Sequence, residues 1–164
     1  MEEKRKKQPV ALYCLAVAAS IALDRWVKAW VVANIPLNAS PAEKIPLLPG
    51  IVHLTYIQNR GAAFGSLQNA RGLFLLLLLV FTAVVVWALA RNKLDNAGER
   101  WMAVLCLGGA LGNGYDRLVN GYVVDMFEVE FMDFAIFNVA DCFVVVGCIV
   151  FILIMLLTPE KKKG

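Results

Sequence analysis

Two aspartates, Asp125 and Asp141, stand sixteen residues apart on either side of a segment that mixes aromatic and acidic residues, and neither has an obvious basic partner. When two carboxylates share one site their titrations separate, so that one is ionised while the other holds a proton. Such a pair can take a proton from water and give one to a carbonyl oxygen, which is the acid–base chemistry of amide hydrolysis. A coupled pair titrates as a unit, so the residues leave open which aspartate is the base.

Further charged and amide residues lie within or beside apolar segments. Asp24 and Lys28 have the i, i+4 spacing of a helix-surface ion pair, although Lys28 could also extend toward the membrane interface. A structural role and a role in an intramembrane site both remain open for this pair. Asn138 and Asp141 have the N-x-x-D spacing of a helix cap followed by an acid in the first turn.

Asn113, Asp116 and Arg117 share one helix face at i, i+3 and i+4. We expect Asp116 and Arg117 to form a salt bridge that organises the site, because a paired arginine keeps a carboxylate ionised. His53 is the single histidine and is expected at the surface of a strand. The four cysteines fall in apolar segments without a C-x-x-C pair, so they are expected as small buried residues; neither a metal site nor another cofactor is indicated.

The composition indicates an integral membrane protein. Of the 164 residues, 60% are hydrophobic and 18% are charged, against about 25% charged in an ordinary globular protein. The mean hydropathy is +0.66. Residues 72–90 form an uncharged run of 19 residues, and about 20 residues of helix cross a hydrocarbon core. The net charge of +3 comes from clusters beside the apolar segments, so it does not indicate a nucleic-acid-binding protein.

Four membrane spans are predicted, at about residues 9–33, 72–90, 101–119 and 137–157, as one all-α membrane domain. Lysine and arginine cluster in the N-terminal tail, in residues 91–100 and in the C-terminal tail. These three segments lie on the same side of a four-span protein, and the positive-inside rule makes that side cytoplasmic.

The outer segments are expected to form a small extended layer. Residues 51–58, "IVHLTYIQ", are rich in β-branched and aromatic residues and predict a strand, which "NRGAAFG" at residues 59–65 interrupts. Counted at about 1.5 Å per helical residue, the polar groups of the spans converge near the outer leaflet. A polar cleft at that depth explains why the chain tolerates carboxylates there.

Three sequence blocks carry a family resemblance: "NRGAAFG" (59–65), "GNGYDRLVNGYVVDMF" (112–127) and "FNVADCFVVVG" (137–147). Their order and spacing, together with the four predicted spans, resemble bacterial lipoprotein signal peptidase, signal peptidase II. The Asp24 and Lys28 pair matches a further block of that family. The resemblance extends over essentially the whole chain.

The resemblance implies an aspartic endopeptidase of the bacterial cytoplasmic (inner) membrane. No cofactor is expected, and a monomer is expected because the four spans give no evidence for an oligomer. Such enzymes cut prolipoproteins before a cysteine carrying a diacylglyceryl group, in contact with membrane lipid, and globomycin-type peptides inhibit them. Asp125 and Asp141 fall on the catalytic positions of the family. The residues that match positions lining or organising its site are Asn59, Gly61, Asn113, Asp116, Arg117, Asn138 and Ala140, with Asp24 and Lys28 beside them.

Two other classes of protein remain open from the residues alone. A small proton-coupled membrane transporter would also carry intramembrane acids, although carriers usually place them near the midplane between repeats. A structural membrane subunit would use the polar groups only to hold helices together. A transporter predicts gradient-dependent flux, a subunit predicts an obligate partner, and a peptidase predicts cleavage by the purified chain.

Overall fold

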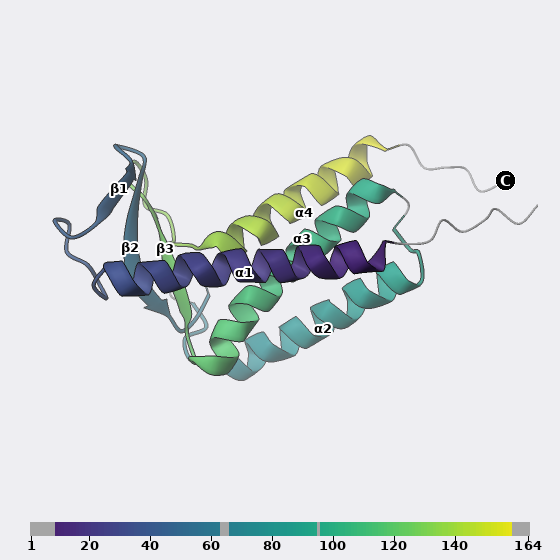
Figure 1. Ribbon diagram of the computed structural model, residues 1–164, viewed down its shortest axis with the longest axis horizontal. Helices are drawn as coiled ribbons and strands as arrows, with labels where there is room; N and C mark the ends of the chain where they lie inside the picture. The colour runs from purple at the N-terminus through teal and green to yellow at the C-terminus, as the bar shows by residue number, and fades with distance from the viewer. Residues whose placement is uncertain (1–8, 63–65, 95, 159–164) are drawn as a thin grey trace, which may run out of the picture.

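The computed structural model describes residues 9–62, 66–94 and 96–158. It consists of a bundle of helices with a small antiparallel sheet at one end (Figure 1). The elements in chain order are α1 (Val10–Asn34), β1 (Ile45–Leu48), β2 (Val52–Asn59), α2 (Arg71–Ala90), α3 (Ala97–Val119), β3 (Val123–Val129) and α4 (Val139–Leu157). The prediction of a mostly helical membrane fold with a small extended layer is therefore confirmed.

Among the described residues, three helices are long and apolar enough to cross a membrane: α1, α2 and α4. The remaining helix, α3, packs against all three and contributes many of the buried residues. Because its neighbours cover much of it, α3 can carry polar residues that a lipid-exposed helix could not. The predicted span at residues 101–119 starts four residues earlier in the structure, at Ala97. There, the Asn96 side chain caps the helix by accepting the Glu99 amide proton at 2.9 Å.

Small residues on α3 allow its neighbours to approach closely. A Cβ atom added to Gly109 would lie 2.3 Å from the carbonyl oxygen of Ala140 on α4, and one added to Gly112 would lie 3.1 Å from a carboxylate oxygen of Asp24 on α1. Such close approach is typical of helix packing in membranes, where van der Waals contact replaces the hydrophobic effect. It brings the polar residues of α1, α3 and α4 together.

The sheet has the order β1-β2-β3 with antiparallel neighbours. It packs on the C-terminal end of α1 through a core that includes Val31, Ile35, Tyr56 and Met126. This core holds β3 beside the helix ends, so Asp125, in the middle of β3, is fixed relative to the bundle. The strand predicted at residues 51–58 is confirmed as β2. The strand β3 forms between α3 and α4.

His53 lies partly exposed on β2 and pairs with Glu130 at 2.8 Å, close to the predicted surface position. Lys44 forms a similar pair with Glu128, with 2.6 Å between the nearest nitrogen and oxygen. Both pairs lie on the sheet rather than in the bundle. They tie β2 and the segment before β1 to β3 and its C-terminal end.

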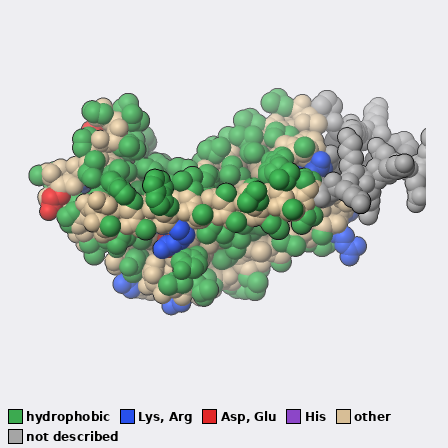
Figure 2. Space-filling view, in the orientation of Figure 1, with side chains coloured by type: hydrophobic (Ala, Val, Ile, Leu, Met, Phe, Trp, Pro, Cys, Tyr) green, Lys and Arg blue, Asp and Glu red, His purple; other side chains and the backbone are tan. Residues whose placement is uncertain are grey.

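The outside of the bundle is largely apolar, as Figure 2 shows along the helices. The expectation that all cysteines are buried is wrong for Cys14 and Cys148, which are exposed on this outer surface, whereas Cys106 is buried. Both residues lie on the apolar surface of the bundle, and the Cys148 Sγ atom lies 3.7 Å from that of the buried Cys106.

The N-terminus of α1 and the C-terminus of α4 lie at the same end of the bundle, opposite the sheet (Figure 1). The basic residues on which the orientation was predicted lie partly outside the described residues, namely Lys4, Arg5, Lys6, Lys7, Lys161, Lys162 and Lys163. The cytoplasmic location of the termini stays a prediction.

Candidate active site

Asp125 points from β3 toward the helix ends and is 2% exposed. Its two oxygens accept hydrogen bonds from side-chain amides: Asn59 Nδ2 at 2.9 Å and Asn138 Nδ2 at 2.5 Å. Burial raises the pKa of this carboxyl from 3.8 to about 6, and the charge of Asp141 contributes to the increase. Hydrogen bonds from both amides act in the opposite direction. Asp125 is therefore a buried carboxyl group that can hold a proton at mildly acidic pH.

Asp141 lies in the first turn of α4, where it completes the predicted capping box. Its backbone N–H donates to Asn138 Oδ1 at 2.9 Å, and its own Oδ2 accepts the Asn138 backbone N–H at 3.0 Å. Its Oδ1 accepts a hydrogen bond from Asn113 Nδ2 on α3 at 2.7 Å. The local sequence N-x-x-D thus fixes the direction of the Asp141 side chain.

Two asparagine side chains link the carboxylate pair, Asp125 and Asp141. Asn138 Nδ2 donates both to Asp125 and, at 3.1 Å, to Asn113 Oδ1, while Asn113 in turn donates to Asp141. Among the described residues, no lysine or arginine forms a salt bridge with either member of the pair. The pair is held by uncharged donors, as its lack of nearby basic residues in the sequence predicted.

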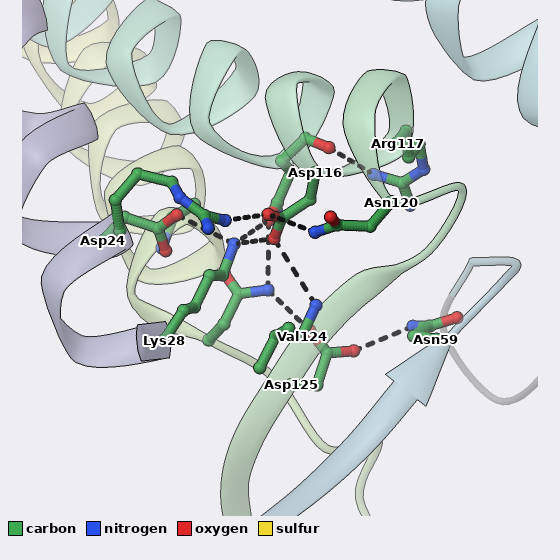
Figure 3. Close-up of polar contacts among 12 residues, drawn as sticks. Asp24, Lys28, Asn59, Asp116, Arg117, Asn120, Val124 and Asp125 are labelled. Atoms are coloured by element: carbon green, nitrogen blue, oxygen red, sulfur yellow. Dashed lines mark hydrogen bonds and ion pairs between the residues drawn. The ribbon is translucent and has the colours of Figure 1, made fainter. Parts of the chain in front are cut away.

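A second set of groups, Asp24, Arg25, Lys28 and Asp116, forms a charged cluster between α1 and α3 (Figure 3). Lys28 Nζ lies 2.8 Å from Asp24 Oδ2 and 2.8 Å from Asp116 Oδ2, and Arg25 forms an ion pair with the other oxygen of Asp116. The i, i+4 pairing of Asp24 with Lys28 is confirmed. Two acids and two bases balance within the cluster.

The predicted salt bridge between Asp116 and Arg117 is wrong. Neighbouring residues on a helix project about 100° apart. Asp116 accordingly faces α1, where Arg25 and Lys28 bind it, whereas Arg117 lies over the ring of Phe74 on α2 at 4.3 Å. Arg25 is a further residue of this cluster that the sequence did not indicate, because its partner Asp116 lies on another helix.

Arg117 holds the end of β2 against α3. Its Nη2 donates to the carbonyl oxygen of Gly61 at 3.0 Å, and the Gly61 amide donates to Asn59 Oδ1 at 2.9 Å. This leaves the amide nitrogen of Asn59 directed at Asp125 (Figure 3). Gly61 also has no room for a side chain, because an added Cβ would lie 2.3 Å from the carbonyl oxygen of Ser66. Residues 63–65 of the same sequence block lie outside the described residues.

Ala140 is fully buried, and its amide donates to Asp24 Oδ1 at 3.0 Å. Asp24 thereby satisfies a free N–H in the first turn of α4 from a neighbouring helix. The structure thus brings the proposed site residues into one connected set, with two of them at its centre and the rest bonded around them: Asp125, Asp141, Asn59, Gly61, Asn113, Asn138, Ala140, Asp24, Lys28, Asp116 and Arg117.

Across residues 9–62, 66–94 and 96–158, no group of three or more His, Cys, Asp or Glu residues could hold a metal ion. The chemistry available at the site is proton transfer by two carboxyl groups, one buried and one partly buried. Together with the bundle, this defines a class: a multi-pass membrane protein with a pair of buried and partly buried carboxyl groups where its helices meet a small sheet.

Comparison with known proteins identifies the family within this class. The family model described as signal peptidase (SPase) II, peptidase family A8, matches residues 16–157, and the chain belongs to this family of peptidases. The lipoprotein signal peptidase of Streptococcus thermophilus (strain CNRZ 1066) is 45% identical over 141 residues, or 86% of this chain and 90% of that protein. The lipoprotein signal peptidase of Streptococcus pyogenes serotype M2 (strain MGAS10270) is 39% identical over 153 residues, or 93% and 97%.

Two solved structures share the fold, each of a bacterial membrane enzyme studied by the in meso method. The one at 2.3 Å resolution superposes with a TM-score of 0.82 at 25% identity and covers 97% of this chain and 98% of that one. The one at 1.9 Å has a TM-score of 0.82 at 26% identity and covers 96% and 100%. The protein is therefore a multi-pass membrane protein.

Proposed function

We propose that this protein removes the signal peptide from lipid-modified prolipoproteins and cuts the chain just before a diacylglyceryl-modified cysteine. Membership of the signal peptidase II family and the names of the streptococcal relatives support this substrate class. The observation that carries the chemistry is the carboxylate pair, a buried Asp125 and a partly buried Asp141 joined through Asn113 and Asn138 and free of ion-pair partners among the described residues.

In the proposed reaction, one carboxylate takes a proton from water and the water oxygen bonds to the scissile carbonyl carbon. The other carboxyl group gives its proton to the carbonyl oxygen, which yields a neutral tetrahedral intermediate. The carbon–nitrogen bond then breaks, and the leaving amine receives the proton that came from water. The second carboxyl recovers its proton from the intermediate, so the pair returns to its starting state.

The depth of the pair suits a substrate anchored in lipid. Asp125 belongs to the sheet and Asp141 to the first turn of α4, so the site lies where the bundle meets the outer layer. In such a substrate the lipidated cysteine lies in one leaflet and the signal helix that precedes it lies in the membrane. The scissile bond between them is therefore presented at such a boundary. We propose that this side faces the outer leaflet of a bacterial cytoplasmic membrane, that both termini are cytoplasmic, and that a monomer is sufficient.

The test uses the purified full-length chain in detergent or lipid with a diacylglyceryl-modified prolipoprotein and its unmodified form. We expect a gel shift for the lipidated substrate only, lost in both Asp125→Asn and Asp141→Asn. Folding of each variant is checked by thermal unfolding, and Cys14→Ser, which changes an exposed residue far from the pair, serves as the matched active control.

If folded wild-type protein cleaves neither substrate, the proposal is overturned. The alternative of a proton-coupled transporter would then be tested as gradient-dependent flux in vesicles. Cleavage that persists in both aspartate variants would leave a peptidase but remove the carboxylate pair from its chemistry. A globomycin-type peptide should inhibit cleavage of the lipidated substrate by the folded wild-type protein.

A further inference from the structure

The two carboxylates are held differently, and the difference assigns their roles. We propose that Asp141 is the ionised member of the pair and acts as the base toward water, that Asp125 holds the proton and acts as the acid, and that Lys28 fixes this order as a positioning residue through Asn113. This assignment rests on the proposed peptidase function.

The surroundings of Asp141 favour a negative charge. It lies at the N-terminal end of α4, where the unpaired amides and the helix dipole stabilise anions. Each of its oxygens accepts an N–H, one from the Asn138 backbone and one from the Asn113 side chain. Three features therefore stabilise the charge, and the position of Asp141 in a capping box requires the carboxylate to be an acceptor.

Lys28 determines which way the Asn113 amide faces. Its ammonium group donates to Asn113 Oδ1 at 2.8 Å, and Asn138 Nδ2 donates to the same oxygen. With its oxygen held by two donors, Asn113 can only present Nδ2 to Asp141. The buried positive charge of Lys28 is thus linked to Asp141 by a single amide, and no such link runs from Lys28 to Asp125.

Asp125 has weaker support for a negative charge. It lies on a strand rather than at a helix N-terminus, and its hydrogen-bond donors are the uncharged side chains of Asn59 and Asn138. Asn138 cannot turn its oxygen toward Asp125, because that oxygen caps α4 through the Asp141 amide. A proton on Asp125 can instead be directed at a substrate carbonyl.

The charged groups around the pair act unequally on its two members. On α1, Lys28 is offset by Asp24, and on α3, Arg117 contributes a positive charge and Asp116 a negative one that Arg25 neutralises. Cys142 follows Asp141 on α4 and is a thiol rather than a charge. Lys28 is linked to Asp141 through the single amide of Asn113, whereas Arg117 is linked to Asp125 only through the Gly61 backbone and the Asn59 amide.

With these roles the proton transfers balance. Asp141 accepts a proton from water as the carbon–oxygen bond forms, and Asp125 donates its proton to the carbonyl oxygen. When the carbon–nitrogen bond breaks, Asp141 gives its proton to the leaving amine of the lipidated cysteine. Asp125 takes a proton from the intermediate as the carboxyl product forms, and the starting states are restored.

The position of the proton can be measured without substrate by infrared difference spectroscopy of the full-length protein between mildly acidic and alkaline pH. Wild type should gain the carbonyl band of a protonated carboxyl group as the pH falls. Asp125→Asn should lose this band, and Asp141→Asn should keep it. The reverse result, or a band unaffected by either substitution, would overturn the assignment.

The role of Lys28 is tested in the Asp125→Asn background, where Asp141 is the remaining member of the pair. Adding Asp24→Asn with Lys28→Met removes one negative and one positive charge together, so the charged cluster stays balanced. We expect the carboxyl band to reappear, now from Asp141, at least one pH unit above any seen with Asp24→Asn alone, the matched control. A purely structural Lys28 would leave the Asp141 titration where the control has it, and that result would remove it as a positioning residue.

Failure of this assignment is distinguishable from failure of the proposed function. The infrared band reports the resting protein, whereas the gel shift reports cleavage. A proton on Asp141 together with intact cleavage would overturn the assignment alone. A proton on Asp125 without any cleavage would overturn the function and leave the order of the two titrations standing.

Discussion

The charged cluster and the carboxylate pair lie side by side and are both built from buried or partly buried aspartates, yet they differ in what surrounds the acid. In the charged cluster, Asp116 accepts ion pairs from Arg25 and Lys28, so its charge is neutralised. In the carboxylate pair, amides supply the hydrogen bonds, and among the described residues no lysine or arginine forms an ion pair with either acid. A carboxylate in a buried ion pair stays ionised and holds helices together. A carboxyl group without an ion pair can instead bind and release a proton.

The largest effect should come from breaking the charged cluster. Asp116→Asn leaves Arg25 and Lys28 with one carboxylate fewer in a buried site, and removal of one partner from such a pair costs about 3–5 kcal/mol. We expect a large drop in the thermal unfolding midpoint in detergent, with activity lost alongside. A well-folded but inactive Asp116→Asn protein would contradict the distinction and place Asp116 in the chemistry.

The carboxylate pair should instead make the stability of the protein depend on pH, because Asp125 is buried. The pKa of Asp125 is raised from 3.8 to about 6, so the folded state binds its proton more tightly than the unfolded state does. Stability from this group is present below about pH 4 and is lost as the pH rises through about 6, for a total of about 3 kcal/mol. Between about pH 4 and about pH 7, the free energy of unfolding of wild type should therefore fall relative to that of Asp125→Asn by up to that amount. Unfolding of both proteins at the two pH values measures the difference.

A control of opposite sign is available at Glu43, on the surface. Hydrogen bonds from Ser40 lower the pKa of the Glu43 carboxyl, so its contribution is lost as the pH falls. Between about pH 4 and about pH 7, the free energy of unfolding of wild type should therefore rise slightly relative to that of Glu43→Gln, opposite to the change expected for Asp125→Asn. Equal unfolding curves for wild type and Asp125→Asn at both pH values would mean that Asp125 carries no unfavourable burial.

The two regions also share a backbone requirement at Gly109. An alanine there would place its Cβ against the Ala140 carbonyl oxygen, so α4 must move and carry Asp141 with it. We expect Gly109→Ala to cost about 1–3 kcal/mol and to lower turnover. Gly72→Ala is the matched control on α2, where an added Cβ meets no atom within 4 Å, and it should be neutral or slightly stabilising. Equal behaviour of the two variants in unfolding and cleavage would refute the close approach.

The features that follow from local sequence were predictable. The N-x-x-D spacing of Asn138 and Asp141 predicted a capping box, and the i, i+4 spacing of Asp24 and Lys28 predicted an ion pair; both are present. The apolar runs located the helices to within a few residues. Each of these depends on periodicity or on contacts within one turn of helix, which the order of residues determines directly.

The contacts between elements were not predictable in the same way. Asp116 was assigned to its neighbour in the chain, Arg117, but its partners come from α1, because the rotation of the helix directs adjacent side chains to different neighbours. The strand β1 was also missed, since its four residues follow a loop and pair only with β2. Long-range pairing depends on how helices and strands pack, and one sequence does not show it.

The smallest effect is expected at the ion pair between His53 and Glu130, which sharpens the comparison by moving the same kind of contact to a partly exposed site. Solvent screens such a pair and its side chains lose mobility on pairing, so its coupling should be about 0.2–1 kcal/mol. A double-mutant cycle with His53→Gln and Glu130→Gln, followed by thermal unfolding at acidic pH, measures it. A coupling as large as the loss in Asp116→Asn would show that ion pairing alone, without burial, accounts for the stability assigned to the charged cluster.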